Sequence, residues 1–289
     1  MNRRRMIGSM AGVAAAAATG LPTREFSLGH AGGAAPLKGN IHHSVCRWCY
    51  ADIPLDKLAE ACVDIGIESI ELLEEKDWAT VKKYGLKCAV GYGTAWGIPK
   101  GFNREENHSK LVADYEAMIP KAAEAGVPNL ICFSGNREGL DDREGLSACA
   151  KGIQKLMPAA EKYGVTLIME LLNTTDHKDY QCDHTAWGVA LCMMVGSERF
   201  KLLYDIYHMQ IMEGNIIDTI RKNYLYIGHY HTGGVPGRHE IDNTQELNYT
   251  AVMKAIAGTG YKGFVGQEFV PSANDKLASL RACIEICDV

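Results

Sequence analysis

Four apolar runs in the second half of the chain each end in a residue that can bind a metal ion. These residues are Glu170 in "IMELLN", Asp205 in "LLYDIYHMQ", His231 in "GHYHTGG" and Glu268 in "VGQEF". A carboxylate at the end of a buried segment is costly to leave unpaired, and three of them close together repel one another. No lysine or arginine stands at these ends, so a divalent cation is the simplest compensating charge. Carboxylates with one imidazole suit Mn²⁺ or Mg²⁺, with Co²⁺ or Zn²⁺ as alternatives.

The segment "YIGHYHTGGVPGRHE", residues 226–240, contains three histidines whose roles differ by position. His229 and His231 are two residues apart, so both can point to the same side of a strand. His231 is nearer the C-terminal end and is the predicted ligand. His229 lies one layer deeper and is predicted to support the residues above it. His239 follows in the loop, and it is either a solvent-exposed histidine or a residue of the site; both interpretations stay open.

Three further side chains are candidates for contacts with a substrate. Arg238 follows a glycine-rich bend and could grip a carboxylate or a pair of hydroxyl groups. Trp48 and Trp96 follow the expected first and third strands and could form an apolar wall for a sugar ring. A surface arginine and ordinary loop tryptophans are the alternatives.

The elements that must position these residues alternate along the chain after residue 38. Eight short apolar runs are each followed by a longer helical pattern, and several of these patterns end at a glycine. Such runs are typical of parallel strands covered on both faces. We therefore expect an α/β fold, a single (β/α)8 barrel, with its chemistry at the C-terminal ends of the strands. A doubly wound sheet is the alternative, but no glycine-rich phosphate turn follows the first strand.

Length and charge narrow the class of ligand. The chain has 289 residues and a formal net charge of −5, so it lacks the broad basic field that holds nucleic acid. No internal apolar run approaches the roughly 20 residues that a membrane span requires. We therefore expect a small carbohydrate or hydroxy-keto acid as substrate, no nucleic acid partner and no stable membrane span. A homo-oligomer is an open expectation.

Residues 1–35 differ from the rest of the chain. Arg3, Arg4 and Arg5 precede an uncharged, alanine-rich run that continues to Ala18. This pattern predicts an export signal of the twin-arginine type with a flexible leader, and hence a periplasmic protein. A plain alanine-rich tail is the alternative. The predicted catalytic barrel then covers residues 36–289.

The chain has ten cysteines, and two of them form a C-x-x-C motif at Cys46 and Cys49. Most of the others stand in apolar patterns, where a free cysteine behaves as a small hydrophobic residue. A redox pair requires this motif at a helix N-terminus, whereas here it follows the expected first strand. A redox pair, a disulfide and simple packing are all left open.

These residues together resemble the xylose isomerase-like superfamily of sugar isomerases and epimerases, and within it the hydroxypyruvate isomerase branch. The resemblance rests on the four strand-end residues, on D-x-x-H at Asp205–His208 and on "VPGRHE" at residues 235–240. It implies one divalent metal ion, often manganese or magnesium, and an acid–base pair formed by Glu170 and Glu268. It also implies that His208 and Arg238 contact substrate oxygens. Hydroxypyruvate isomerases usually have glutamine where this chain has His231, and histidine there resembles the ketose 3-epimerases.

The predicted function is a metal-dependent isomerase or epimerase of a small hydroxy-carbonyl compound or sugar. A cation that binds a carbonyl and a neighbouring hydroxyl acidifies the C–H bond between them and stabilises an enediolate. One glutamate would remove the proton and the other would return one. A lyase or hydrolase acting on keto-sugars on the same scaffold, and a non-catalytic exported sugar-binding protein, are the alternatives.

Overall fold

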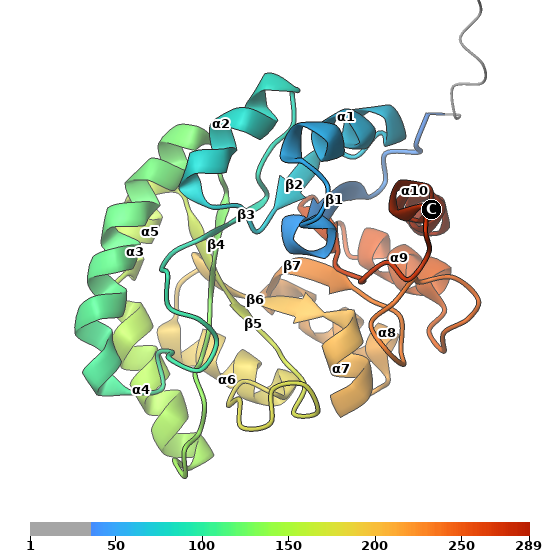
Figure 1. The fold of residues 1–289 in the computed structure, drawn as a ribbon. Coiled ribbons are helices and arrows are strands. Elements are labelled where there is room, and N and C mark those ends of the chain that lie inside the picture. Colours follow the sequence, from blue (N-terminus) through green and yellow to red (C-terminus); the bar gives the residue numbers. More distant parts are fainter. Residues whose placement is uncertain (1–35) are drawn as a thin grey trace, which may run out of the picture. The chain divides into compact units, whose positions relative to one another are not determined.

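Eight parallel β-strands form a barrel, and helices surround it (Figure 1). The structure is a computed structural model, and it describes residues 36–289. The predicted (β/α)8 barrel is confirmed, whereas the predicted export segment over residues 1–35 lies outside the described residues. The strands are β1 (His42–Cys46), β2 (Ser69–Glu71), β3 (Val90–Tyr92), β4 (Asn129–Cys132), β5 (Thr166–Glu170), β6 (Phe200–Asp205), β7 (Ile227–Thr232) and β8 (Phe264–Gln267).

The barrel is nearly closed, with one thin joint between β2 and β3. The strand order is β2-β1-β8-β7-β6-β5-β4-β3, and every pair of neighbours is parallel. β2 and β3 meet only through the isolated bridges Ser69–Lys87 and Leu73–Gly91. The amide of Ile70 donates to the Lys87 carbonyl at 3.1 Å across this joint. We call it the β2–β3 seam.

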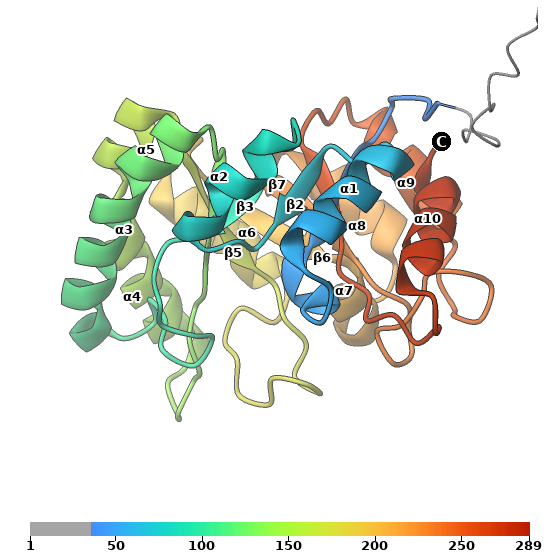
Figure 2. The same ribbon diagram turned by 45° about the horizontal axis from the view of Figure 1, so that its top comes forward.

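The helices lie on the outside of the strands, as a view turned by 45° shows with α3 on one side and α10 on the other (Figure 2). Two short 3₁₀ helices, η1 (Arg47–Tyr50) and η2 (Tyr224–Tyr226), precede α1 and β7. The α-helices are α1 (Leu55–Ile65), α2 (Glu75–Lys83), α3 (Glu105–Ala125), α4 (Asp142–Gln154), α5 (Met157–Tyr163), α6 (Thr185–Val195), α7 (Ile206–Met212), α8 (Ile216–Asn223), α9 (Tyr249–Gly258) and α10 (Lys276–Cys287).

Two helices differ from what the sequence pattern indicates. The pattern over residues 142–164 reads as one helix, but the structure divides it into α4 and α5. Pro158 stands in the first turn of α5, where its missing amide hydrogen costs nothing. The segment after Asp205 reads as a loop, but α7 begins there, and the Asp205 carboxylate caps it by accepting from the His208 amide.

The predicted glycine stops are correct at the helices that return to the next strand. Gly66 follows α1 with a φ of 93°, and its amide donates to the carbonyls of Cys62 and Val63. Gly126 follows α3 with a φ of 79°. A left-handed conformation is strained for residues with a Cβ, so glycine at these positions ends the helix and turns the chain back toward the barrel.

The strand register brings the C-terminal ends of β5 to β8 to a common level. Asp205 pairs with His231, and His231 pairs with Gly266 on the next strand. Glu170 pairs with Leu203, two positions before the end of β6. The last residues of these strands therefore face one mouth of the barrel, where the packed interior ends.

All ten cysteines are free and buried. Cys46 ends β1 and Cys49 lies in η1, and no disulfide joins them. Cys49 is buried in the core, whereas Sγ of Cys46 lies 3.7 Å from Nε2 of His231 and 3.8 Å from Oε1 of Glu71. Among the described residues, none of the helices is both long enough and apolar enough to cross a bilayer.

Candidate metal and active site

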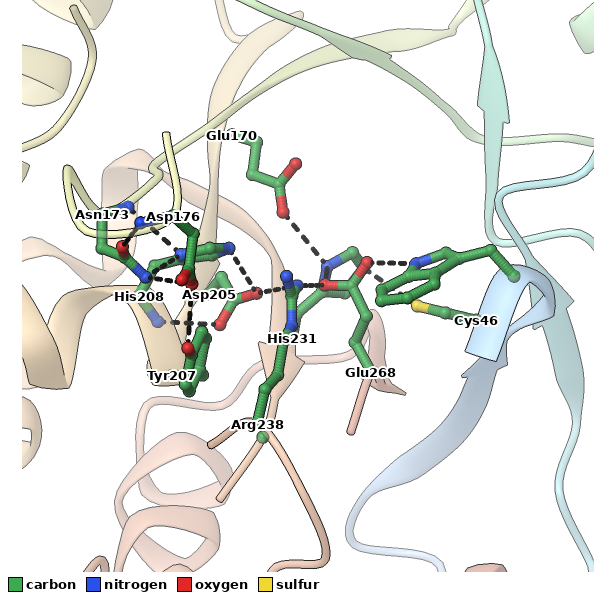
Figure 3. A network of polar contacts seen from close by, with 12 residues as sticks. Cys46, Glu170, Asn173, Asp176, Asp205, Tyr207, His208, His231, Arg238 and Glu268 are labelled. Atoms are coloured by element: carbon green, nitrogen blue, oxygen red, sulfur yellow. Dashed lines mark hydrogen bonds and ion pairs between the residues drawn. The ribbon is translucent and has the colours of Figure 1, made fainter. Parts of the chain in front are cut away.

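The four residues predicted to bind a metal lie together at the mouth of the barrel (Figure 3). Each offers one ligand atom, and these atoms all lie within 4.8 Å of one another. The side chains come from the ends of β5, β6 and β7 and from the residue after β8. All four are buried, which leaves three carboxylates and one imidazole in contact without bulk water between them: Glu170, Asp205, His231 and Glu268.

His231 is held so that one ring nitrogen is free to bind a cation. Its Nε2 lies 2.7 Å from Oε1 of Glu71, which is a hydrogen-bond distance. Its Nδ1 lies 2.8 Å from Oε2 of Glu268 and 3.6 Å from Oε1 of Glu170. Nδ1 nevertheless has no hydrogen-bond partner among the described residues. Nδ1 and the carboxylate oxygens thus lie close together without a hydrogen bond to Nδ1, and a shared cation would satisfy such an arrangement.

Asp205 divides its two oxygens between structure and site. Oδ1 accepts from the backbone amide of His208 at 3.2 Å and so caps α7. Oδ2 faces the cluster and lies 3.6 Å from Nε2 of His208. The cap fixes the side chain, so the remaining oxygen is presented to the mouth with little freedom.

Arg238 supplies a positive charge that the sequence analysis did not place beside the three carboxylates. The sequence places no basic residue at a strand end, but the loop after β7 brings Arg238 into the cluster. Its Nη2 lies 3.1 Å from Oδ2 of Asp205 and 2.6 Å from Oε2 of Glu268. The guanidinium also lies over the rings of Trp48 and Tyr207, at 5.3 and 5.2 Å from their centroids. One fixed cation against three carboxylates reduces the need for a metal ion without removing it.

The three carboxyl groups differ in how readily they hold a proton. Burial raises the pKa of Asp205 to about 8, against the opposing effect of Arg238. Burial also raises the pKa of Glu170, more strongly than His231 lowers it. Burial opposes the charge of Glu268 as well, but His231 and Arg238 together hold its pKa well below the usual range. Glu268 is therefore the most firmly ionised member of the cluster.

His208 presents a donor to the site. Its Nδ1 accepts from the backbone amide of Asn173 at 3.1 Å, which places the ring hydrogen on Nε2. That Nε2 is buried without a hydrogen-bond partner among the described residues. Burial lowers the pKa of His208 well below its usual value, so the ring is neutral. A neutral Nε2–H beside Asp205 is suited to donate to a substrate oxygen.

The two tryptophans predicted to contact substrate occupy different places. The Nε1–H of Trp48 donates to Oε1 of Glu268 at 2.7 Å, and 41% of the residue is exposed, so it stands at the mouth. Trp96 lines a separate hollow of about 830 Å³ beside α2 and α3, under the ammonium of Lys100. Tyr92, at the end of β3, lines the same hollow. Burial raises the pKa of Tyr92, and the charges of Glu268 and Glu170 add to that effect.

The other two histidines of the segment 226–240 have distinct surroundings. His229 is fully buried, and its Nε2 lies 2.8 Å from Oε1 of Glu71, so it does lie in the layer beneath the cluster. His239 is exposed, and its Nδ1 lies 2.9 Å from the Val270 carbonyl. That contact ties the β7 loop to the segment after β8.

Sequence reasoning missed Glu71 and two residues beside His208, Asn173 and Tyr207. Glu71 ends β2 in the apolar run "SIELL", the same signal that identified Glu170. Asp176 accepts from the Tyr207 hydroxyl at 2.8 Å and from the Asn173 side chain at 3.0 Å, so these groups fix the wall beside His208 (Figure 3). Their spacing in the sequence carries no such pattern.

The chain belongs to the xylose isomerase-like TIM barrel family. The family model of that description matches residues 51–285, which is most of the chain. This confirms the resemblance drawn from the strand-end residues and from the "VPGRHE" segment.

Proteins named as isomerases are among the relatives. A 2-oxo-tetronate isomerase of Cupriavidus necator is 38% identical over 115 residues, a match that spans 40% of this chain and 44% of that protein. A hydroxypyruvate isomerase of Escherichia coli is 29% identical over 234 residues, or 80% of this chain and 83% of the relative. These relatives and the family confirm the prediction that the chain is an enzyme of the isomerase and epimerase class.

Solved structures with the same fold include two epimerases. A D-psicose 3-epimerase from Clostridium cellulolyticum aligns with a TM-score of 0.68 and 17% identity, over 86% of this chain and 98% of the other. A 3-keto-D-glucoside 4-epimerase from E. coli aligns with a TM-score of 0.71 and 19% identity, over 85% and 98%. At these identities the likeness shows the fold.

Proposed function

We propose that the protein is a metal-dependent isomerase or epimerase of a small hydroxy-carbonyl compound or sugar, and that it moves a proton with two glutamates. One observation carries the proposal: three buried carboxylates converge on Nδ1 of His231, which has no hydrogen-bond partner among the described residues. The family and the isomerase relatives support the reaction class. The substrate class follows hydroxypyruvate isomerase most closely, with ketose epimerisation as the competing branch.

The donor set fits one divalent cation. Glu170, Asp205 and Glu268 would each give a carboxylate oxygen, and His231 would give Nδ1. This mostly hard set favours Mn²⁺ or Mg²⁺, with Co²⁺ or Zn²⁺ as alternatives. When bound, the cation would polarise the carbonyl of the substrate and acidify the neighbouring C–H bond.

The two glutamates are held differently, which suggests different roles. Oε1 of Glu268 accepts from Trp48 and Oε2 accepts from Arg238, so this carboxylate is fixed from both sides. Among the described residues the carboxylate of Glu170 has one ionic partner, His231, at 3.6 Å. Burial also raises its pKa, so Glu170 takes up a proton more readily than an ordinary glutamate does. We assign the main acid–base step to Glu170 and the complementary proton transfer to Glu268.

The walls of the mouth would orient the substrate. The Nε2–H of His208 and the guanidinium of Arg238 both face the carboxylate cluster, where substrate oxygens would lie. Trp48 offers a partly exposed indole at the rim, and Trp96 would be reached only by a substrate that extends past Tyr92. A short hydroxy-keto acid would therefore use Arg238 and His208 but not Trp96.

The decisive experiment is hydrogen exchange with solvent deuterium. The purified protein, loaded with Mn²⁺ or Mg²⁺, is incubated in D₂O with hydroxypyruvate, ketohexoses and 3-keto sugars, and NMR follows the hydrogen next to the carbonyl. We expect one compound class to exchange and to form an isomer. Glu170→Gln and Glu268→Gln should each abolish exchange, whereas Glu285→Gln, an exposed glutamate on α10, should leave it unchanged.

The same panel separates the alternatives. A lyase would exchange the hydrogen and then release a fragment, which appears as a new product and not as an isomer. A non-catalytic sugar-binding protein would show no exchange with any compound while still binding one. Either result would contradict the proposal.

A further inference from the structure

Beneath the mouth, Glu71 and His229 form a buried triad with His231, and the proposed chemistry uses only His231 of the three. Glu71, His229 and His231 come from β2 and β7, and all three are fully buried. In the strand order, β1 and β8 separate β2 from β7, so Glu71 reaches its partners across the barrel interior. A carboxylate in such a place costs free energy unless it is paired, so its presence calls for an explanation.

Both histidines share one oxygen of Glu71. Nε2 of His229 lies 2.8 Å and Nε2 of His231 lies 2.7 Å from Oε1. Oxygen of a carboxylate can only accept, so each Nε2 carries the hydrogen and donates it. The hydrogen on Nε2 leaves Nδ1 of a neutral His231 with its lone pair, and that atom faces Glu170 and Glu268.

We infer that Glu71 is a positioning residue for the metal site, which sets the tautomer and ring angle of His231 and strengthens Nδ1 as a ligand. A carboxylate behind a ligating imidazole fixes its orientation and raises its basicity. Glu71 is fully buried, and its Oε1 is already shared by the two histidines, so we assign it no contact with substrate. The inference rests on the proposed metal site, but the hydrogen on Nε2 of His231 can be tested without any metal.

Gly266 on β8 leaves just enough space for the contact between Glu71 and His231. A Cβ on Gly266 would lie 2.5 Å from Oε1 of Glu71 and 2.9 Å from Cδ2 of His231. Any larger residue would therefore push the carboxylate away from the ring. Gly266 also pairs with His231 in the sheet, so the strand that carries Glu268 makes room for the support of its neighbour.

The same three residues could instead hold a second cation, since their ligand atoms lie within 4.8 Å of one another. Both Nε2 atoms lie in hydrogen-bonding geometry toward Oε1 of Glu71, whereas Nδ1 of His231 has no hydrogen-bond partner among the described residues, and this difference favours the positioning role. A positioning role predicts one metal ion per chain. A second site predicts two.

The first test uses metal affinity. Apo protein is titrated with Mn²⁺ or Zn²⁺ against a chromophoric chelator, and bound metal is counted by elemental analysis. We expect Glu71→Gln to weaken the affinity for the cation by about 10- to 100-fold. The wild-type protein should bind one metal ion per chain. Glu213→Gln is the matched control, because Glu213 is a part-buried acceptor for Thr185 and not for His231. An unchanged affinity in Glu71→Gln, or two ions per wild-type chain, would overturn the inference.

The second test does not depend on a Glu71 variant that folds or on a bound metal. Long-range ¹H–¹⁵N correlation spectra of the metal-free protein report which ring nitrogens carry a hydrogen, with His231→Asn used for assignment. We expect a hydrogen on Nε2 of His231. A ring whose Nε2 carries no hydrogen would overturn the inference even if metal binds. A wild-type chain that binds no metal would refute the proposed function, whereas a hydrogen on Nε2 would still support the Glu71 contact.

Discussion

The two halves of the barrel use acidic residues in opposite ways. Strands β5 to β8 end in Glu170, Asp205 and His231 and lead into Glu268, and these groups leave Nδ1 of His231 without a partner. Strands β1 to β4 end in Cys46, Glu71, Tyr92 and Cys132, of which one is acidic, and its Oε1 accepts from two histidines. The comparison teaches that one half of the barrel presents the candidate metal ligands, whereas the other half supplies a contact that holds one of them, His231.

Removal of His231 should have the largest effect, because this residue joins the two halves. His231→Ala loses the only nitrogen ligand of the cluster and the link between Glu71 and Glu268. We expect loss of the bound metal and a fall in kcat/KM of at least about 1000-fold. Elemental analysis and the exchange assay measure the two effects. A variant that retains one metal ion per chain would show that the carboxylates suffice.

Arg238 lies in the half of the barrel formed by β5 to β8, and it can be removed without removing any of the four candidate metal ligands. Arg238→Ala takes a positive charge away from Asp205 and Glu268, so metal affinity should stay equal or rise. We expect kcat/KM to fall by about 100-fold through loss of a substrate contact, and Arg238→Lys to fall less because the charge remains. The exposed Arg143→Ala is the control. A parallel loss of metal and activity would assign Arg238 to the metal site instead.

Tyr249 tests whether support for the mouth also comes from outside the barrel. Its buried hydroxyl donates to the Gly233 carbonyl at 2.7 Å and accepts from the Gly233 amide at 2.9 Å, just after β7. Tyr249→Phe leaves both backbone groups unpaired, so we expect a loss of about 1–3 kcal/mol in the free energy of unfolding. Urea denaturation measures it. Unchanged stability would mean that water replaces the hydroxyl.

Substitution of Glu240 should have the smallest effect of the four, and its effect on the free energy of unfolding should depend on pH. Burial opposes its charge, but hydrogen bonds from Ser272, the Ala273 amide and Ser279 lower the pKa of Glu240 to about 2. A folded-state pKa below the unfolded value means that the charged form stabilises the fold above about pH 4.5 and that this contribution is lost as pH falls toward 2. We therefore expect Glu240→Gln to be less stable than wild type at pH 6 and to approach it at pH 3. A constant difference would contradict this assignment.

Much of the half formed by β5 to β8 could be predicted from the sequence, because apolar strands that end in Glu, Asp or His are local signals. The eight-fold alternation of strands and helices and the glycines that end the helices are also local signals, and they predicted the barrel. Glu71 carried the same signal as Glu170, but its role depends on a contact across the interior with β7, which no local pattern encodes. Arg238 was predicted as a substrate contact, but its ion pairs with Asp205 and Glu268 depend on the path of the loop after β7. The division of α4 from α5 follows from Pro158, which a period of 3.6 residues does not reveal.

The β2–β3 seam determines where the barrel is expected to open locally. Neighbouring strands such as β6 and β7 share four paired positions, whereas β2 and β3 are joined by two isolated bridges. Local opening of a ring begins at its weakest joint, and Glu71 stands beside this one. In native-state hydrogen exchange, the amides of Ile70 and Leu72, which donate across the joint to Lys87 and Val90, should exchange before those of residues 202–205. The support of the metal site would then be the part of the barrel that fluctuates first.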